Sequence, residues 1–277
     1  MSSMDPEALA HELLAALSRG DTNITPPSAR DASFDLAAAY ATEEAAVRLR
    51  RAAGYVTAGR KVGYANKAVW RIFKLGTLVW AHMYNDTVRF ADAAQTVALS
   101  VGHLSSPKIE PEIVFRLKEP LGPSGEIDAQ RVLGSVEWLA LGFEVIACPF
   151  PDWKFQPADF VAACGLHAAL VVGAPLPIDT SKVGPLAEQL PSFKVKLLKN
   201  GQVGAEGSGK NSLRSPALCL GELAAAIARE PTAEPLAAGD LISSGTLTES
   251  LPMAPGETWE AVVEGIELPA LTLRCEP

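Results

Sequence analysis

The amino-acid sequence predicts an α+β protein, in which helices come first and a mainly antiparallel or mixed β-sheet with a few helices follows. Residues in the first 60 positions have apolar side chains at helical spacing. From Pro107 onward, short apolar runs separated by turn residues dominate. The chain has no internal repeat and no long linker.

Two helices are expected near the N-terminus. The first begins at Pro6 with Asp5 as its cap and ends by Gly20. The second covers Asp35 to Ala53, a stretch rich in Ala, Glu and Arg, and ends at Gly54. Acidic side chains occupy the N-terminal stretch where a secretory signal would carry basic ones, so an ordinary amphipathic helix is the better interpretation.

Strand and turn signals follow along the rest of the chain. Tyr55 to Ala65 contains a short strand-like piece between two glycines. The sequence Lys199-Asn200-Gly201 between two apolar runs is a strong hairpin signal. Pro216 begins a helix after Ser215, and residues 259–265 alternate between two faces as a strand does.

Composition limits the classes of function. The 277 residues suffice for one large domain or one domain with a smaller appendage. A net charge of −8 and a pI near 5.1 argue against a nucleic-acid surface, although one metal ion and one lysine can still attract a small anion. Residues 160–178 are apolar but contain His167, glycines and prolines, so a buried strand followed by a loop is expected there. Four cysteines without a close pair indicate thiols in a reducing cytoplasm: Cys148, Cys164, Cys219 and Cys275.

Alternating acids mark the segment from Lys108 to Leu117. Read as a strand, it places its apolar residues on one face and Glu110, Glu112 and Val114 on the other. Two carboxylates side by side repel each other unless water or a cation separates them, and oxygen ligands suit Mg²⁺ or Mn²⁺. A solvated edge strand is the alternative interpretation of this segment alone.

Two further charged residues bear on this hypothesis. Glu144 is the one charged residue in the apolar run from Trp138 to Ala147, and such a carboxylate should be paired, protonated or bound to metal. It could also lie at a strand end and reach solvent. Lys61 lies between Gly59 and Gly63, where the backbone can place it tightly, although a lysine in such a position is more often at the surface.

Five segments together resemble the 2-hydroxypenta-2,4-dienoate hydratases. With the 4-oxalocrotonate decarboxylases, these enzymes belong to the fumarylacetoacetate hydrolase superfamily. The resemblance covers roughly residues 55 to 275, and the N-terminal helices are similar only in type. The segments are GRKVG (59–63), KIEPEIVFRLKEPL (108–121), FEVI with DW (143–146, 152–153), LLKNGQVGAEGSG (197–209) and AGDLISSGTL (238–247).

The resemblance implies a fold and a site. The implied fold is a fumarylacetoacetate hydrolase C-terminal-like mixed β-sheet roll over residues 61–277, preceded by a helical segment over residues 1–60. The family's G-H-L-F-x-D pattern is similar to residues 81–86, which makes Asp86 a candidate acid/base or orienting residue. By the same comparison, the metal ligands are Glu110, Glu112 and Glu144, the active-site lysine is Lys61, and the loop that holds the substrate carboxylate through its backbone is Gly245, Thr246 and Leu247.

The implied reaction is metal-dependent hydration of a 2-hydroxy-2,4-dienoate to a 4-hydroxy-2-oxo acid, as in aromatic-compound catabolism. The cofactor would be Mg²⁺ or Mn²⁺, and the protein would be a cytoplasmic homo-oligomer that binds neither nucleic acid nor membrane. Decarboxylation of a 4-oxalocrotonate-type diacid and C–C hydrolysis of an acylpyruvate remain open, since both use the same metal chemistry. A diacid would need a second cationic anchor, for which Arg60, Arg71 and Lys74 are the candidates nearest in sequence.

Two segments depart from the family pattern, and both fall near the expected pocket. Ala163 to Leu166 replaces the family's D-N-A-S, and Thr248 to Ser250 replaces its G-P-M turn. A non-catalytic relative is therefore a third hypothesis, although a scaffold has no need to keep repelling acids together. The P-loop-like stretch 204–211 is interpreted as a turn, because Asn211 stands where that motif needs Ser or Thr. His167, in its apolar run, is interpreted as a satisfied core residue.

Overall fold

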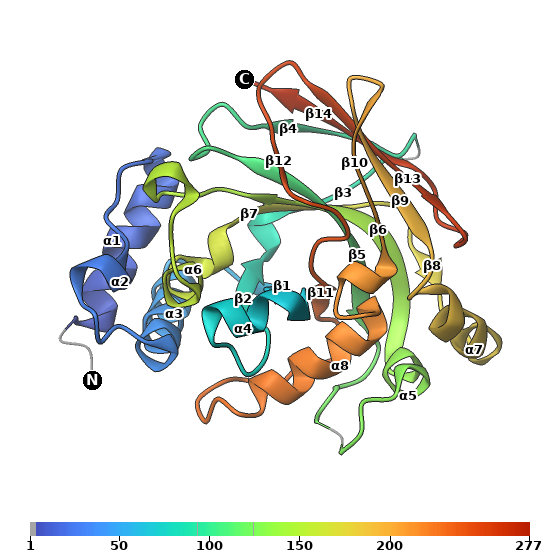
Figure 1. Ribbon diagram of the computed structural model, residues 1–277, viewed down its shortest axis with the longest axis horizontal. Coiled ribbons are helices and arrows are strands. Elements are labelled where there is room, and N and C mark those ends of the chain that lie inside the picture. The colour runs from blue at the N-terminus through green and yellow to red at the C-terminus, as the bar shows by residue number, and fades with distance from the viewer. Residues whose placement is uncertain (1–3, 93, 124) are drawn as a thin grey trace.

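The computed structural model describes residues 4–92, 94–123 and 125–277 and confirms the α+β prediction. The N-terminal helices lie together at one side of strongly curled sheets, and helix α8 lies beneath the larger sheet (Figure 1). The helices are α1 (Pro6–Arg19), α2 (Pro27–Arg30), α3 (Leu36–Ala52), α4 (Trp70–Phe73), α5 (Ala129–Gly134), α6 (Pro157–Ala162), α7 (Thr180–Gln189) and α8 (Pro216–Ile227), with short 3₁₀ turns η1 (Lys67–Val69), η2 (Asn85–Thr87), η3 (Pro151–Trp153), η4 (Cys164–Leu166) and η5 (Gly209–Asn211).

The described strands form two sheets. The larger, nine-stranded sheet has the order β2-β1-β11-β5-β6-β7-β3, with β12 beside β5 and β8 beside β6. The five-stranded sheet has the order β10-β9-β13-β14-β4. The strands are β1 (Thr57–Gly63), β2 (Val79–Tyr84), β3 (Val88–Phe90), β4 (Thr96–Ser100), β5 (Lys108–Leu117), β6 (Val136–Ile146), β7 (His167–Val172), β8 (Leu176–Pro177), β9 (Lys194–Lys199), β10 (Gln202–Ser208), β11 (Leu241–Ser243), β12 (Leu251–Pro252), β13 (Thr258–Glu264) and β14 (Leu271–Glu276).

Local signals in the sequence set the ends of these elements. The Asp5 carboxylate accepts a hydrogen bond from the backbone of α1, which ends at Gly20 in the left-handed conformation (φ 71°). Asp35 caps α3 in the same way. Asn200 and Gly201, both with positive φ, form the turn between β9 and β10, as their sequence predicts.

The apolar faces of the two sheets form the main core together with α8. In β5, four apolar residues that alternate along the strand are fully buried in this core, as its pattern predicts: Ile109, Ile113, Phe115 and Leu117. A second cluster joins α1 and α3 to α6 through residues such as Leu13, Phe34 and Phe160. The N-terminal helices therefore pack directly against the segment that precedes β7.

Residues 160–178 do not form one continuous element. The expected buried strand is β7, whereas the residues before it belong to α6 and η4. Among the described residues, no helix is both long and apolar enough to cross a membrane. The four cysteines are buried free thiols.

Candidate metal centre

Three glutamates meet where β5 and β6 pair. In the antiparallel register, Glu110 lies directly opposite Glu144 and Glu112 lies opposite Gly142. Because side chains two residues apart on a strand share a face, all three carboxylates project to the same side. One oxygen from each lies within 4.8 Å of the others. The structure thus brings together the three acids that the sequence nominated, two from one strand and one from its partner.

Burial and mutual repulsion disfavour the charged forms of two of these acids. Burial is the largest influence on Glu110 and raises its pKa to about 7, with Glu144 adding to the rise and Lys61 opposing it. The pKa of Glu112 lies well above its usual range for the same reason, burial first and then the charges of Glu144 and Glu110. A divalent cation among these acids would oppose both effects and favour their ionised forms.

Glu112 carries the observation that most directly fits a cation. Its Oε2 atom accepts hydrogen bonds from Ser243 Oγ at 2.5 Å and from the Gly245 backbone N–H at 2.8 Å. Its Oε1 atom is buried and has no hydrogen-bond partner among the described residues. A buried carboxylate oxygen without a donor is costly unless an ion satisfies it. The donor set of carboxylate oxygens is the one that Mg²⁺ and Mn²⁺ favour.

Lys61, on β1, reaches the same cluster. Its side chain is almost fully buried, and Nζ lies 3.0 Å from Glu144 Oε2 and 2.9 Å from the Gly165 carbonyl oxygen, to which it donates a hydrogen bond. Burial disfavours the ammonium form, but the carboxylates of Glu144, Glu110 and Glu112 outweigh it and raise the pKa of Lys61. The lysine is therefore a cation held at the edge of the acids.

Glu144 is the acid that remains ionised. Burial works against its charge, yet the ion pair with Lys61 and a hydrogen bond with His167 lower its pKa. His167 Nδ1 lies 3.0 Å from Glu144 Oε1, and His167 Nε2 lies 2.9 Å from Thr87 Oγ1. His167 is therefore buried with both ring nitrogens in hydrogen bonds, as expected. One of its partners, Glu144, is a candidate metal ligand. The sequence offered no signal for this contact, because the two residues are neighbours only through the pairing of β6 with β7.

A cavity of about 360 Å³ opens in front of Lys61 and Glu110. Its other lining residues are mostly apolar or uncharged: Val62, Gly63, Tyr64, Ala65, Asn66, Ile146, Phe160, Asn211, Thr246 and Thr248, with the acidic Glu249. Glu112 and Glu144 lie behind this lining with no exposed surface. A small acid in the cavity would meet Glu110 and Lys61 in its lining.

The loop Gly245 to Leu247 lies against the same site, but its backbone is largely engaged. Gly245 N–H donates to Glu112, and Leu247 N–H donates to the Pro111 carbonyl. Leu247 is fully buried, whereas Thr246 lines the cavity. Two of the three backbone groups expected to hold the substrate therefore hold the loop to β5, and Thr246 is the residue placed for a ligand.

The structure does not bring Asp86 into this cavity. Asp86 lies in η2, and its carboxylate is 2.9 Å from Arg50 Nη2 on α3. It lines a different hollow, together with Thr87 and His167. Of these, His167 is hydrogen-bonded both to Thr87 Oγ1 and to Glu144 Oε1. The motif that nominated Asp86 could not show Arg50, which comes from another part of the chain.

The unusual segment before β7 has a role that its sequence did not reveal. Cys164, Gly165 and Leu166 adopt the left-handed conformation one after another, with φ of 54°, 63° and 57°. This turn directs the Gly165 carbonyl oxygen to Lys61 Nζ. A backbone carbonyl thus supplies a polar contact in the segment where the family pattern places polar side chains.

The carboxylates cluster beside a buried lysine on a curled mixed sheet, and a small cavity opens in front of them. This arrangement defines a candidate divalent-metal enzyme site. Comparison with known families agrees with this description. The family model described as "Fumarylacetoacetate (FAA) hydrolase C-terminal" matches residues 76–272. The chain belongs to the fumarylacetoacetate hydrolase family.

Named relatives and solved structures resemble the chain over most of its length. A 2-hydroxyhexa-2,4-dienoate hydratase of Comamonas testosteroni is 30% identical over 79% of this chain and 79% of its own. A 2-keto-4-pentenoate hydratase of Paraburkholderia xenovorans is 27% identical over 96% of this chain and 94% of its own. The 4-oxalocrotonate decarboxylase from Pseudomonas putida G7, complexed with magnesium and adipate, has the same fold, with a TM-score of 0.87 at 23% identity over 99% of this chain and 98% of its own.

Proposed function

We propose that this protein is a divalent-metal-dependent hydratase that converts a 2-hydroxy-2,4-dienoate into a 4-hydroxy-2-oxo acid. The observation that carries the proposal is the cluster of the partly buried Glu110 with the buried Glu112 and Glu144, beside Lys61 and against a small cavity. The hydratase relatives named above support the substrate class.

The three glutamates would hold the ion. Glu112 Oε1, which has no hydrogen-bond partner among the described residues, would be one of its ligands. When bound, a divalent ion supplies Lewis acidity toward the carboxylate and 2-oxygen of the substrate. His167 fixes the orientation of Glu144 through Nδ1, and Ser243 and Gly245 fix Glu112 in the same way.

Lys61 is the group placed to move protons. Its Nζ atom is held by Glu144 and by the Gly165 carbonyl at the cavity wall. In the reaction, the Lys61 ammonium group would give a proton to C5 and regain one from the 2-hydroxyl group, which moves the double bond to C3–C4. Water then adds its hydroxyl to C4 and a proton to C3. The pairing of Asp86 with Arg50 supports no proton transfer by Asp86, and we assign it none.

The lining of the cavity favours a monoacid over a diacid. Among the described residues that line it, Lys61 is the one basic side chain, and Glu249 adds a negative charge. Arg60 projects from the other face of β1 and lies 5.4 Å from the Trp80 ring, while Arg71 and Lys74 are not part of the lining. A second substrate carboxylate would therefore find no second basic side chain among the described lining residues, which argues against the decarboxylase alternative.

A side-by-side assay tests the proposal. Purified protein is supplied with Mg²⁺ or Mn²⁺ and given 2-hydroxypenta-2,4-dienoate, a 4-oxalocrotonate-type diacid or an acylpyruvate. We expect turnover of the dienoate, and a Glu110→Gln variant should lose bound metal, measured by elemental analysis, together with activity. Preferential turnover of the diacid would replace the proposal with decarboxylation. Full activity of Glu110→Gln after chelator treatment would refute the metal site.

We also propose that the ion is Mg²⁺ or Mn²⁺, that the protein is a cytoplasmic homo-oligomer, and that residues 61–277 form the catalytic unit behind the helical residues 1–60. Four buried free thiols support a reducing compartment. Exposed apolar side chains such as Ile72 and Phe90 support self-association. Light scattering after size-exclusion chromatography would measure the number of subunits.

A further inference from the structure

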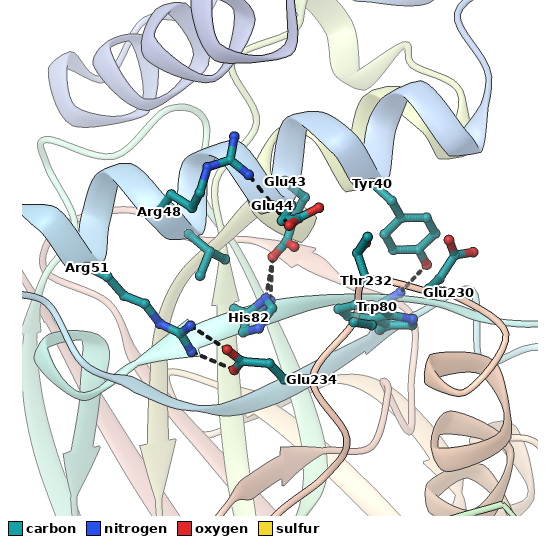
Figure 2. A pocket seen from close by; sticks show the side chains of 12 residues that line it. Tyr40, Glu43, Glu44, Arg48, Arg51, Trp80, His82, Glu230, Thr232 and Glu234 are labelled. Carbon is teal, nitrogen blue, oxygen red and sulfur yellow. Dashed lines mark hydrogen bonds and ion pairs between the residues drawn. The ribbon is translucent and has the colours of Figure 1, made fainter.

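A second cavity lies on the opposite face of β1 and β2 from the carboxylates. In their antiparallel register, Lys61 pairs with Ala81 and Arg60 pairs with His82. Since neighbouring residues on a strand point to opposite faces, Lys61 points to the metal site and His82 points away from it. The cavity lies on the His82 side, between α3, β2 and the segment that follows α8 (Figure 2). It is therefore separate from the substrate cavity.

This cavity has aromatic and acidic walls. Its volume is about 180 Å³, enough for a small organic molecule but not for a peptide. The rings of Tyr40 and Trp80 lie with their centroids 4.9 Å apart at one end, and Figure 2 shows both facing the same hollow as Glu43 and Glu230. The remaining lining residues are Glu44, Val47, Arg48, Arg51, His82, Thr232, Ala233 and Glu234.

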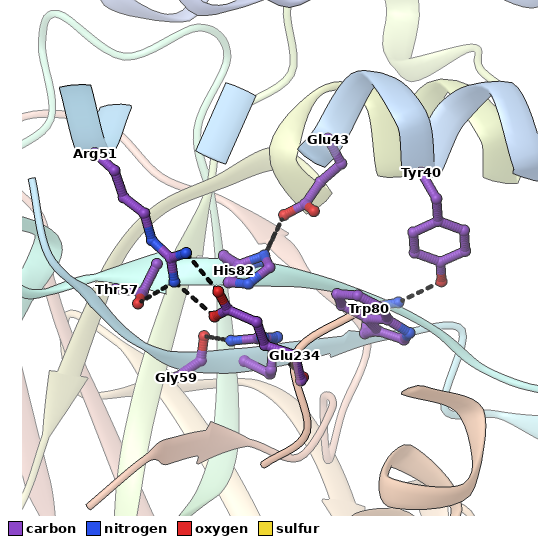
Figure 3. A network of polar contacts seen from close by, with 9 residues as sticks. Tyr40, Glu43, Arg51, Thr57, Gly59, Trp80, His82 and Glu234 are labelled. Carbon is purple, nitrogen blue, oxygen red and sulfur yellow. Dashed lines mark hydrogen bonds and ion pairs between the residues drawn. The ribbon is translucent and has the colours of Figure 1, made fainter. Parts of the chain in front are cut away.

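Glu43 is a buried, ionised carboxylate at this wall. Its side chain is 3% exposed, and burial acts to raise its pKa, but His82 and Arg60 outweigh burial and lower it. Its Oε1 atom accepts hydrogen bonds from the His82 backbone N–H at 2.9 Å and from His82 Nδ1 at 2.8 Å (Figure 3). Its Oε2 atom makes no hydrogen bond to any described residue.

His82 leaves a second polar atom unused. His82 Nδ1 makes the hydrogen bond to Glu43, whereas Nε2, on the other side of the ring, takes no part in it. This Nε2 atom is buried and has no partner within the described chain, and the residue is 7% exposed. Glu43 Oε2 is therefore the acceptor that this wall leaves without a donor.

The basic side chains of the cavity are already paired. Arg51 Nη1 lies 2.6 Å from Glu234 Oε1 (Figures 2 and 3), and Arg48 Nη1 lies 3.6 Å from Glu44 Oε1 at the rim (Figure 2). The Glu230 carboxylate has no ion-pair or hydrogen-bond partner among the described residues, and burial raises its pKa. The unpaired carboxylate groups of the cavity are acceptors, Trp80 Nε1 is a buried donor without a partner, and both arginines of the described lining are in ion pairs.

We propose that this cavity is a binding site for a small organic ammonium ion with an apolar body. The ammonium group donates to Glu43 Oε2, while the body lies against the rings of Tyr40 and Trp80, where aromatic faces attract a cation. The ligand has the opposite charge to a dienoate. The site is therefore independent of the proposed reaction.

Titration calorimetry with benzylammonium tests the proposal, using benzyl alcohol and benzoate as neutral and anionic isosteres. Metal-loaded protein is used, so that Glu110, Glu112 and Glu144 do not offer a competing anionic site. We expect saturable binding of benzylammonium, at least tenfold weaker binding of benzyl alcohol, and no binding of benzoate. Equal affinity for benzylammonium and benzyl alcohol, or no saturable binding of benzylammonium at millimolar concentration, overturns the proposal.

Three variants locate the binding. Glu43→Gln should weaken benzylammonium at least tenfold, and Ala233→Phe should abolish its binding by filling the cavity. Glu44→Gln is the matched control, because this neighbouring acid is already paired with Arg48 at the rim. It should bind as the native protein does. Should Glu43→Gln fail to fold, Ala233→Phe decides alone, and native affinity in Ala233→Phe refutes the site.

Discussion

Gly165 is the residue through which the left-handed turn before β7 contacts Lys61, and Gly165→Ala would disturb that contact specifically. A Cβ atom at Gly165 would lie 2.7 Å from Lys61 Cδ and 2.9 Å from Ala81 Cβ. Gly201→Ala is a matched control. Gly201 has a similar φ of +78°, against +63° for Gly165, but no atom lies within 4 Å of its added Cβ.

The two substitutions share a backbone cost and differ in their contacts. A non-glycine residue in the left-handed region costs about 1–2 kcal/mol. Overpacking against Lys61 and Ala81 adds about 1–3 kcal/mol at Gly165 alone. At about 2–4 °C per kcal/mol, the melting temperature should fall by roughly 4–20 °C for Gly165→Ala and roughly 2–8 °C for Gly201→Ala.

Activity should separate the variants more sharply than stability does. If Lys61 carries the proton, displacing its Nζ atom by about 1 Å should lower kcat by about 100-fold, with KM and metal affinity near native values because the three glutamates are untouched. Loss of the dienoate absorbance and calorimetric titration with Mn²⁺ measure these quantities. Equal kcat in Gly165→Ala and Gly201→Ala, or a loss of metal affinity that matches the loss of kcat, would refute the positioning role of this turn.

Three other changes test the site. In the metal-free protein, burial and neighbouring acids raise the pKa of Glu112, so the folded state keeps a proton that the unfolded chain loses near pH 4.5, and stability falls as pH rises above that value. Metal-free Glu112→Gln should therefore melt above the native protein at pH 8, and a lower melting temperature would contradict this. His167→Ala, which frees Glu144, should weaken Mn²⁺ binding about 10–100-fold, and unchanged titrations would show that His167 does not orient the ligand. Asp86→Asn should change kcat less than about threefold, since Asp86 pairs with Arg50, and a large loss with normal folding would restore it as a catalytic residue.

Local signals in the sequence were sufficient for much of the fold. Asp5 and Asp35 marked the starts of α1 and α3, and Asn200-Gly201 marked the turn between β9 and β10. These features depend on residues a few positions apart. The order of strands in the sheet was not predicted, because β1 pairs with β11 across most of the chain and no local pattern encodes that pairing.

The same distinction applies to the site. Alternation in β5 placed Glu110 and Glu112 on one face, and the apolar surroundings of Glu144 marked it as a buried acid. Their meeting depends on the register of β5 with β6, which the family resemblance implied but periodicity could not show. The role of His167 and the pairing of Asp86 depend on contacts between residues 23 and 36 positions apart, which lie outside any motif.

The pairing of Glu110 with Glu144 also has a consequence for folding. A slip of one residue between β5 and β6 would turn the acids of one strand toward the apolar face. A slip of two residues would move Glu110 and Glu144 about 7 Å apart along the strand. An ion that needs all three oxygens binds tightly only to the native alignment. Metal in the refolding mixture should therefore stabilise molecules with the native register of β5 and β6 and increase their share before any substrate is present.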